Sequence, residues 1–120
     1  DLIVLAGYMK VISPKFIKAF SHKIINIHPS LLPKYKGLHA VEQAFQSKDK
    51  ETGCTVHYVT DELDSGEIID QSVVPICPSD TVDKLTYCIQ QAEHRLLPLV
   101  INNYESKESN QRSIKAAMAV

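Results

Sequence analysis

Two short runs rich in Ile, Leu and Val, separated by a segment with helical spacing, constrain the fold of this chain most strongly. The runs are Leu2–Ala6 and residues 23–28, and both are too short to be helices. Apolar runs of this length are typical of strands that a parallel sheet buries on both faces. Between them, Ser13 is a favourable N-cap and Pro14 suits the first position of a helix. The order strand, helix, strand therefore predicts a right-handed parallel crossover.

The rest of the chain predicts two more strands and two more helices. Residues 54–60 are rich in β-branched and aromatic side chains, residues 67–74 are similar, and their short connection favours antiparallel pairing. Residues 39–47 have helical spacing, and a long helix is predicted from an N-cap at Asp80, with Pro98 kinking or ending it. We therefore expect an α/β fold: a partial Rossmann-like open sheet, mixed parallel with a C-terminal antiparallel strand pair, and helices on both faces.

Composition excludes several classes of function. The 120 residues suffice for one domain, and 44% of them are hydrophobic, which is enough for a core. The net charge is -1, the pI is about 6.6 and the basic residues are scattered, so nucleic acid is not an expected partner. Cys54, Cys77 and Cys88 lack the spacing of a zinc site, and no run approaches the ~18 apolar residues of a membrane span. We expect a soluble, cytoplasmic protein that uses no metal and no membrane.

Polar residues at the predicted strand ends suggest a reactive site. Asn26 and His28 share one face of the second strand, and the acidic loop 61–66 follows the strand at 54–60. Ligands of open α/β sheets bind at the carboxyl ends of the strands. An amide, an imidazole and the Asp64 carboxylate there are able to stabilise an oxyanion and to move a proton, as acyl or formyl transfer requires.

Each of these residues also has an ordinary structural interpretation. Buried polar groups such as Asn26 and His28 need hydrogen-bond partners in any strand. Asp64 lies in an Asp-Ser-Gly sequence, where an acid often caps its own turn. His57 is interpreted as a strand histidine facing solvent or a neighbour, and we leave it outside the predicted catalytic set.

Two longer segments, residues 26–37 and 52–66, resemble the phosphoribosylglycinamide formyltransferase family of folate-dependent enzymes in purine synthesis. The similarity extends from residue 1 to about residue 104. Methionyl-tRNA formyltransferases and formyltetrahydrofolate deformylases share the Asn-x-His pattern and the later Asp. The sequence His-Pro-Ser-Leu-Leu-Pro at residues 28–33 favours the glycinamide family over both.

The resemblance implies a reaction and a set of site residues. A formyl group would pass from the co-substrate 10-formyltetrahydrofolate to the amine of glycinamide ribonucleotide, without a metal. Asn26 and a protonated His28 would donate hydrogen bonds to the oxyanion, while Asp64 would hold His28 and position a proton-relaying water. The folate would contact Met9, Lys10, Val11, Ile12, Val59, Thr60, Asp61 and Glu62. The ribonucleotide would contact Ile27, Pro29, Gln90 and Glu93.

The glycine-rich phosphate loop of the family is not found in this sequence. Its four glycines are far apart, so they supply no nest of successive N–H donors. We therefore expect residues 1–105 to be the C-terminal, folate-binding and catalytic part of a formyltransferase domain, followed by a polar tail at 106–120, of which residues 114–120 could dock back. Leu2–Ala6 would then be an apolar sheet edge, open to self-association or to pairing with an N-terminal fragment.

Three functions remain open from the sequence. The first, which we prefer, is the catalytic part of a glycinamide ribonucleotide formyltransferase, incompetent as this chain alone. The second is a deformylase-like hydrolase, which would release formate without needing the ribonucleotide. The third is a non-catalytic folate-binding fragment, which would bind a folate analogue without turnover.

Overall fold

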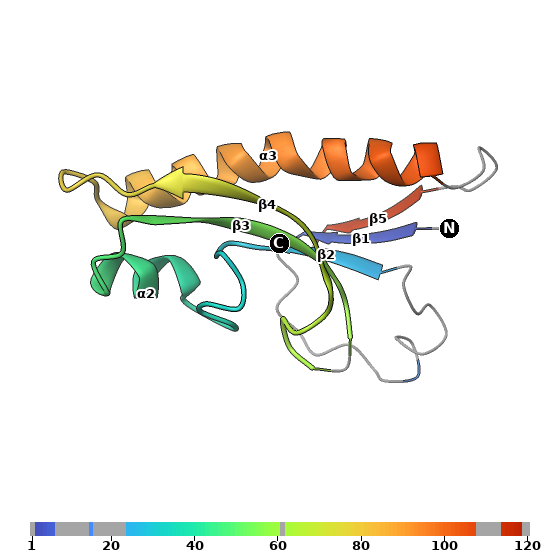
Figure 1. Cartoon of the computed structure of the whole chain (residues 1–120), viewed down its shortest axis with the longest axis horizontal. Helices are drawn as coiled ribbons and strands as arrows, with labels where there is room; N and C mark the ends of the chain where they lie inside the picture. Colours follow the sequence, from blue (N-terminus) through green and yellow to red (C-terminus); the bar gives the residue numbers. More distant parts are fainter. Residues whose placement is uncertain (1, 7–14, 16–23, 61, 108–113, 119–120) are drawn as a thin grey trace.

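The computed structural model describes residues 2–6, 15, 24–60, 62–107 and 114–118, and within these it contains a single mixed sheet (Figure 1). The strand order is β4-β3-β2-β1-β5. The strands are β1 Leu2–Ala6, β2 Ile24–His28, β3 Glu51–Tyr58, β4 Ile68–Pro75 and β5 Ile114–Met118. Among the described residues, the helices are α2 Ala40–Gln46 and α3 Val82–Lys107. Apart from Lys15, the helix expected after Ser13 lies outside the described residues.

The pairing of the strands confirms the mixed sheet. β1 and β2 run parallel, as the predicted crossover requires, and β3 and β4 form the predicted antiparallel pair. β3 also runs antiparallel to β2, which the sequence did not predict, with Asn26 opposite His57 and His28 opposite Thr55. This register brings polar side chains of two strands together on one face.

The prediction that Leu2–Ala6 forms an open sheet edge is wrong. β5 pairs with β1 in parallel along the whole of that strand. The backbone N–H and C=O groups of β1 find partners there, as buried strand groups must. Consequently residues 114–118 dock back on the sheet, and α3 extends to Lys107, where a polar tail was expected. The expected pairing with another copy or with an N-terminal fragment required this edge to be free, and β5 occupies it.

The hydrophobic core lies between α3 and one face of the sheet, and α3 covers that face (Figure 1). Alternate residues of the strands face the helix, while the residues between them face the other side. The core contains Leu2, Val4, Ile25, Ile27, Val41, Cys54, Val56, Val74, Leu85, Ile89, Ala92, Leu96 and Val100. α2 lies beyond the carboxyl end of β2 and contributes Val41 to this core. The helix predicted to cover the opposite face is the one outside the described residues.

The ends of α3 differ from the prediction in two details. Thr81, not Asp80, is the N-cap, because its Oγ1 accepts a hydrogen bond from the Lys84 N–H at 3.1 Å. The Asp80 carboxylate instead accepts the N–H of Cys77 at 2.8 Å. Pro98 lies inside α3 on its exposed side, and the helix continues beyond it to Lys107. No helix in the described part of the chain is long and apolar enough to cross a membrane.

Candidate active site

The candidate site lies on the face of the sheet opposite α3. Ile25, Ile27, Cys54 and Val56 face α3 in the core. The residues that alternate with them on β2 and β3 therefore face the other way. These residues are the buried polar side chains Asn26, His28, Thr55 and His57. The loops that follow β2 and β3 return to this same face, so the sheet's only concentrated set of buried polar groups within the described residues is here.

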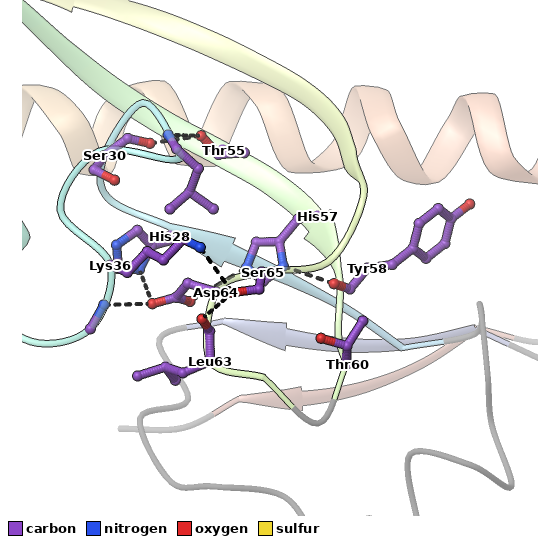
Figure 2. Close-up of polar contacts among 12 residues, drawn as sticks. His28, Ser30, Lys36, Thr55, His57, Tyr58, Thr60, Leu63, Asp64 and Ser65 are labelled. Carbon is purple, nitrogen blue, oxygen red and sulfur yellow. Dashed lines mark hydrogen bonds and ion pairs between the residues drawn. The ribbon is translucent and has the colours of Figure 1, made fainter.

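His28 and Asp64 form a buried ion pair at the centre of the site. His28 Nδ1 lies 3.3 Å from Asp64 Oδ2, and the two side chains are only 2% and 4% exposed. Asp64 reaches this position from the turn after β3, where its φ of 51° is the left-handed conformation that Asp tolerates better than most residues. Figure 2 shows the rings of His28 and His57 approaching the same carboxylate. The structure thus brings together the imidazole and the acid that the sequence predicted.

Asp64 has two further neighbours that keep it ionised. Its Oδ2 accepts the Gly37 N–H at 2.7 Å, and its Oδ1 lies 3.6 Å from His57 Nε2. Burial alone raises the pKa of Asp64, but the His57 ring, the Gly37 N–H and the charge of His28 outweigh burial, and the net pKa is lower than usual. His57 therefore faces a neighbour, Asp64, which is one of the two orientations expected from the sequence, and it lies beside the predicted catalytic residues.

The second nitrogen of the His28 ring also meets an acceptor. His28 Nε2 lies 2.8 Å from the backbone oxygen of Tyr35. With Asp64 at Nδ1, both ring nitrogens face oxygen atoms that can only accept. Both contacts are hydrogen bonds when each ring nitrogen carries a hydrogen.

The loop that carries Tyr35 and Gly37 is fastened to β3 by Thr55. Thr55 Oγ1 donates to the Ser30 oxygen at 2.7 Å and accepts the Leu32 N–H at 3.1 Å. The Gln71 amide of β4 donates both to Thr55 Oγ1 and to the Leu32 oxygen, at 3.0 Å each. The loop thus lies against two strands, which holds the Tyr35 oxygen and the Gly37 N–H in place.

Asn26 lies on the same face and offers an unused polar atom. The residue is 8% exposed, and its buried Oδ1 has no hydrogen-bond partner among the described residues. A buried polar group without a partner costs about 1–3 kcal/mol. Because Oδ1 can only accept a hydrogen bond, a donor role of Asn26 belongs to its Nδ2.

The residues predicted to contact the folate are only partly described. Met9, Lys10, Val11, Ile12 and Asp61 lie outside the described residues.

Three others of this predicted set lie where β3 leaves the sheet. The N–H of Val59 donates to the Ile24 oxygen at 2.9 Å. Thr60 Oγ1 lies within hydrogen-bond distance of both the N–H and the oxygen of Glu62, at 3.3 and 3.1 Å, which forms a small turn. Thr60 and Glu62 are exposed, so they border the turn that carries Asp64 without contacting its carboxylate.

The residues predicted to contact the ribonucleotide are not gathered around His28. Pro29 follows β2 directly and is half-buried beside the site. The side chain of Ile27 belongs to the core and faces α3, so only its backbone faces the site. Gln90 and Glu93 lie on α3, over the other face of the sheet, and no described contact joins them to Asp64.

Glu93 predicts a pH dependence of stability. Burial raises the pKa of the Glu93 carboxyl from 4.5 to about 7. Burial also raises the pKa of the Cys54 thiol, to about 11. A carboxyl pKa that is higher in the folded state contributes stability at low pH, which is lost as the pH rises from 4.5 towards 7. We expect Glu93→Gln to remove this loss, which is at most about 3 kcal/mol at roughly 1.4 kcal/mol per pKa unit. Urea unfolding at pH 5 and pH 8 tests it, and equal pH dependence in both proteins would contradict it.

The described residues offer no obvious metal or disulfide chemistry. No group of three or more His, Cys, Asp or Glu residues in the described ranges could hold a metal ion. Cys54, Cys77 and Cys88 are free thiols.

Comparison with known proteins identifies the family. Residues 1–101 match the formyl transferase family, to which this chain belongs. It is 49% identical over 102 residues to the phosphoribosylglycinamide formyltransferase of Escherichia coli, covering 85% of this chain and 48% of that protein. It is 50% identical over 106 residues to the trifunctional purine biosynthetic protein adenosine-3 of Drosophila melanogaster, covering 85% of this chain and 8% of that protein. The chain thus spans about half the length of the E. coli relative.

Solved structures agree with this assignment. A phosphoribosylglycinamide formyltransferase from Bacillus halodurans is 47% identical, with a TM-score of 0.86 over 92% of this chain and 57% of that one. A formyltetrahydrofolate deformylase from Pseudomonas syringae is 34% identical, with a TM-score of 0.84 over 88% of this chain and 36% of that one. The family resemblance and the mixed α/β sheet predicted from the sequence are therefore confirmed.

Proposed function

We propose that this chain provides the catalytic site of a phosphoribosylglycinamide formyltransferase. The reaction would transfer the formyl group of 10-formyltetrahydrofolate to the amine of glycinamide ribonucleotide, in the cytoplasm. The observation that carries the proposal is the buried pair of His28 and Asp64, 3.3 Å apart, on the face that also bears Asn26. The names of the relatives support the choice of substrate.

The proposed chemistry follows from the charges that develop on the formyl group. Attack by the amine nitrogen on the formyl carbon turns the carbonyl oxygen into an oxyanion. The Asn26 amide would donate a hydrogen bond to that oxygen, and the positive charge of the His28 imidazolium, which Asp64 would hold, would stabilise the oxyanion electrostatically. The carbon–nitrogen bond to the folate then breaks, and the proton lost by the attacking amine reaches the leaving nitrogen. Asp64, being ionised, is suited to hold the water that carries this proton.

The burial of the pair favours this role over a purely structural one. An ion pair removed from water is a weak source of stability, because desolvation offsets much of its attraction. The same removal from water strengthens the field that the pair exerts on a neighbouring reacting group. A site with a fixed imidazolium therefore stabilises negative charge without needing to reorganise.

The test separates the three functions that the sequence left open. The chain is incubated with 10-formyltetrahydrofolate and glycinamide ribonucleotide, alone and together with the part of the E. coli relative that it does not match. Formylated ribonucleotide as the product supports the transferase. Formate released without the ribonucleotide would instead identify a hydrolase. Calorimetric binding of a folate analogue with no turnover in either mixture would identify a binding fragment and overturn the proposal.

A further inference from the structure

The His28 ring contacts a backbone oxygen that belongs to a loop and not to a helix or strand. The contact from Nε2 to the Tyr35 oxygen, at 2.8 Å, is shorter than the 3.3 Å contact from Nδ1 to Asp64. Tyr35 belongs to the loop between β2 and α2, seven residues after His28. The orientation of the ring is therefore set as much by this loop as by the carboxylate.

Tyr35 adopts a backbone conformation that requires support. Its φ of 54° lies in the left-handed region, which a bulky residue rarely occupies. Such conformations persist where the surrounding contacts determine them, and they concentrate at functional sites. A change in φ or ψ at this residue would turn its carbonyl away from His28.

The side chain of Tyr35 supplies the support. Its hydroxyl donates a hydrogen bond to Asp49 Oδ2 at 2.8 Å, across fourteen residues of sequence. Asp49 follows the last turn of α2, where its N–H bonds to the Ala44 oxygen at 3.3 Å. The Lys34 ammonium lies 3.9 Å from the same Oδ2. Asp49 is thus held just beyond the C-terminal end of α2, and it makes none of the contacts of Asp64.

We propose that Tyr35 and Asp49 form a positioning pair that fixes the His28 imidazole. The Asp49 carboxylate holds the Tyr35 hydroxyl, this hold keeps the Tyr35 backbone in its left-handed conformation, and the Tyr35 oxygen then fixes Nε2 of His28. Neither side chain reaches the reacting atoms, so both act through His28. The catalytic consequence rests on the proposed function, whereas the effect on the ring does not.

The first test measures the ring directly in the chain as it exists. Long-range 1H–15N spectra record the two ring nitrogens of His28 in the wild type, Tyr35→Phe, Asp49→Ala and Asp49→Asn. We expect the His28 Nε2 signal to move in Tyr35→Phe and Asp49→Ala, because each breaks the hold on the Tyr35 oxygen. Asp49→Asn keeps an acceptor oxygen and should stay close to the wild type. Tyr87→Phe makes the same chemical change at a tyrosine that is 62% exposed on α3, and should change nothing.

The second test measures formyl transfer with the same variants. We expect kcat to fall about tenfold in Tyr35→Phe and in Asp49→Ala, with KM within about twofold of the wild type. A misplaced His28 ring affects the chemical step more than it affects substrate binding. The double variant should be no slower than either single one, because both changes break one connection.

The outcomes distinguish this inference from the proposed function. Ring signals unchanged in both Tyr35→Phe and Asp49→Ala would overturn the inference. Loss of the folded state in both would also overturn it, because the pair would then be structural. If the wild-type chain transfers no formyl group even together with the part of the E. coli relative that it does not match, but its ring signals move as expected, the proposed function is wrong and the positioning pair is supported.

Discussion

Replacement of Asp64 by asparagine is expected to lower formyl transfer by about 100- to 1000-fold, a cost as large as that of losing one oxyanion donor, because the charge that holds the imidazolium is removed. The Asp64 carboxylate is the acceptor that faces Nδ1 of His28 and the N–H of Gly37. An asparagine has nearly the same shape but carries no charge, so the imidazolium loses its partner. Initial rates with 10-formyltetrahydrofolate and glycinamide ribonucleotide measure the effect under the conditions in which the wild type is active.

Two controls make this result interpretable. Asp70→Asn makes the same change at an exposed carboxylate of β4, and it should keep the wild-type rate. Asn26→Ala removes the proposed oxyanion donor and should cost a similar factor, again about 100- to 1000-fold. An Asp64→Asn chain that retains more than about a tenth of the activity would show that the buried pair does not serve the reaction.

Asp64→Asn is also expected to change how the stability of the fold depends on pH. The pKa of Asp64 is lower in the folded chain than usual, so its charge stabilises the fold at neutral pH, and this contribution is lost as the pH falls through the lowered pKa. The wild type should therefore be more stable than Asp64→Asn at pH 7, and the difference should shrink in acid. Chemical unfolding of both proteins between pH 7 and pH 3 measures this, and a constant difference would contradict it.

The elements that could be predicted from the sequence are those specified by local patterns. The β-branched and aromatic residues of 54–60, the similar composition of 67–74 and the period near 3.6 in α3 are visible in the sequence, so β3, β4 and α3 lie close to their predicted positions. The residue types of the site, His28 and Asp64, were predicted from the sequence. The rule that parallel strands end at one edge of a sheet does not explain why they meet, because β3 is antiparallel to β2 and its carboxyl end lies beside the start of β2. Asp64 reaches His28 because the turn after β3 folds back over the face of the sheet.

The features that could not be predicted depend on tertiary register. β5 has no strong strand pattern, and it forms because β1 offers unpaired backbone groups. The Tyr35 oxygen and the Gly37 N–H are backbone atoms, so no residue type marks them. One feature of the sequence could have placed His57 in the site: it lies two residues from Thr55 and so shares its face. Its position opposite Asn26 depends on the antiparallel pairing of β2 with β3, which the sequence did not predict.

The turn that carries Asp64 also depends on Gly66, because neighbouring atoms leave no room for a side chain there. A Cβ atom at Gly66 would lie 1.7 Å from the Tyr58 oxygen and 3.3 Å from the Thr60 Cγ2. Real Cβ atoms do not approach a backbone oxygen so closely, and this oxygen belongs to the last residue of β3. Only glycine therefore fits at this position, where the chain returns from the turn to the sheet. The next residue, Glu67, accepts the Tyr58 N–H at 2.9 Å, which holds the two segments together.

Gly66→Ala is expected to lower the free energy of unfolding by roughly 3–5 kcal/mol, at the upper end of single substitutions, because backbone has to move to relieve the overlap. Urea denaturation measures the loss. Ser65→Ala, one residue earlier, removes side-chain bonds to Leu63 and Lys36 at an exposed position without adding an atom, and should cost less than about 1 kcal/mol. A Gly66→Ala chain as stable as Ser65→Ala would mean that the turn carrying Asp64 does not pass so close to β3. If the stability falls as expected, the same movement should displace Asp64 from His28, so that any folded fraction transfers the formyl group more slowly than the wild type.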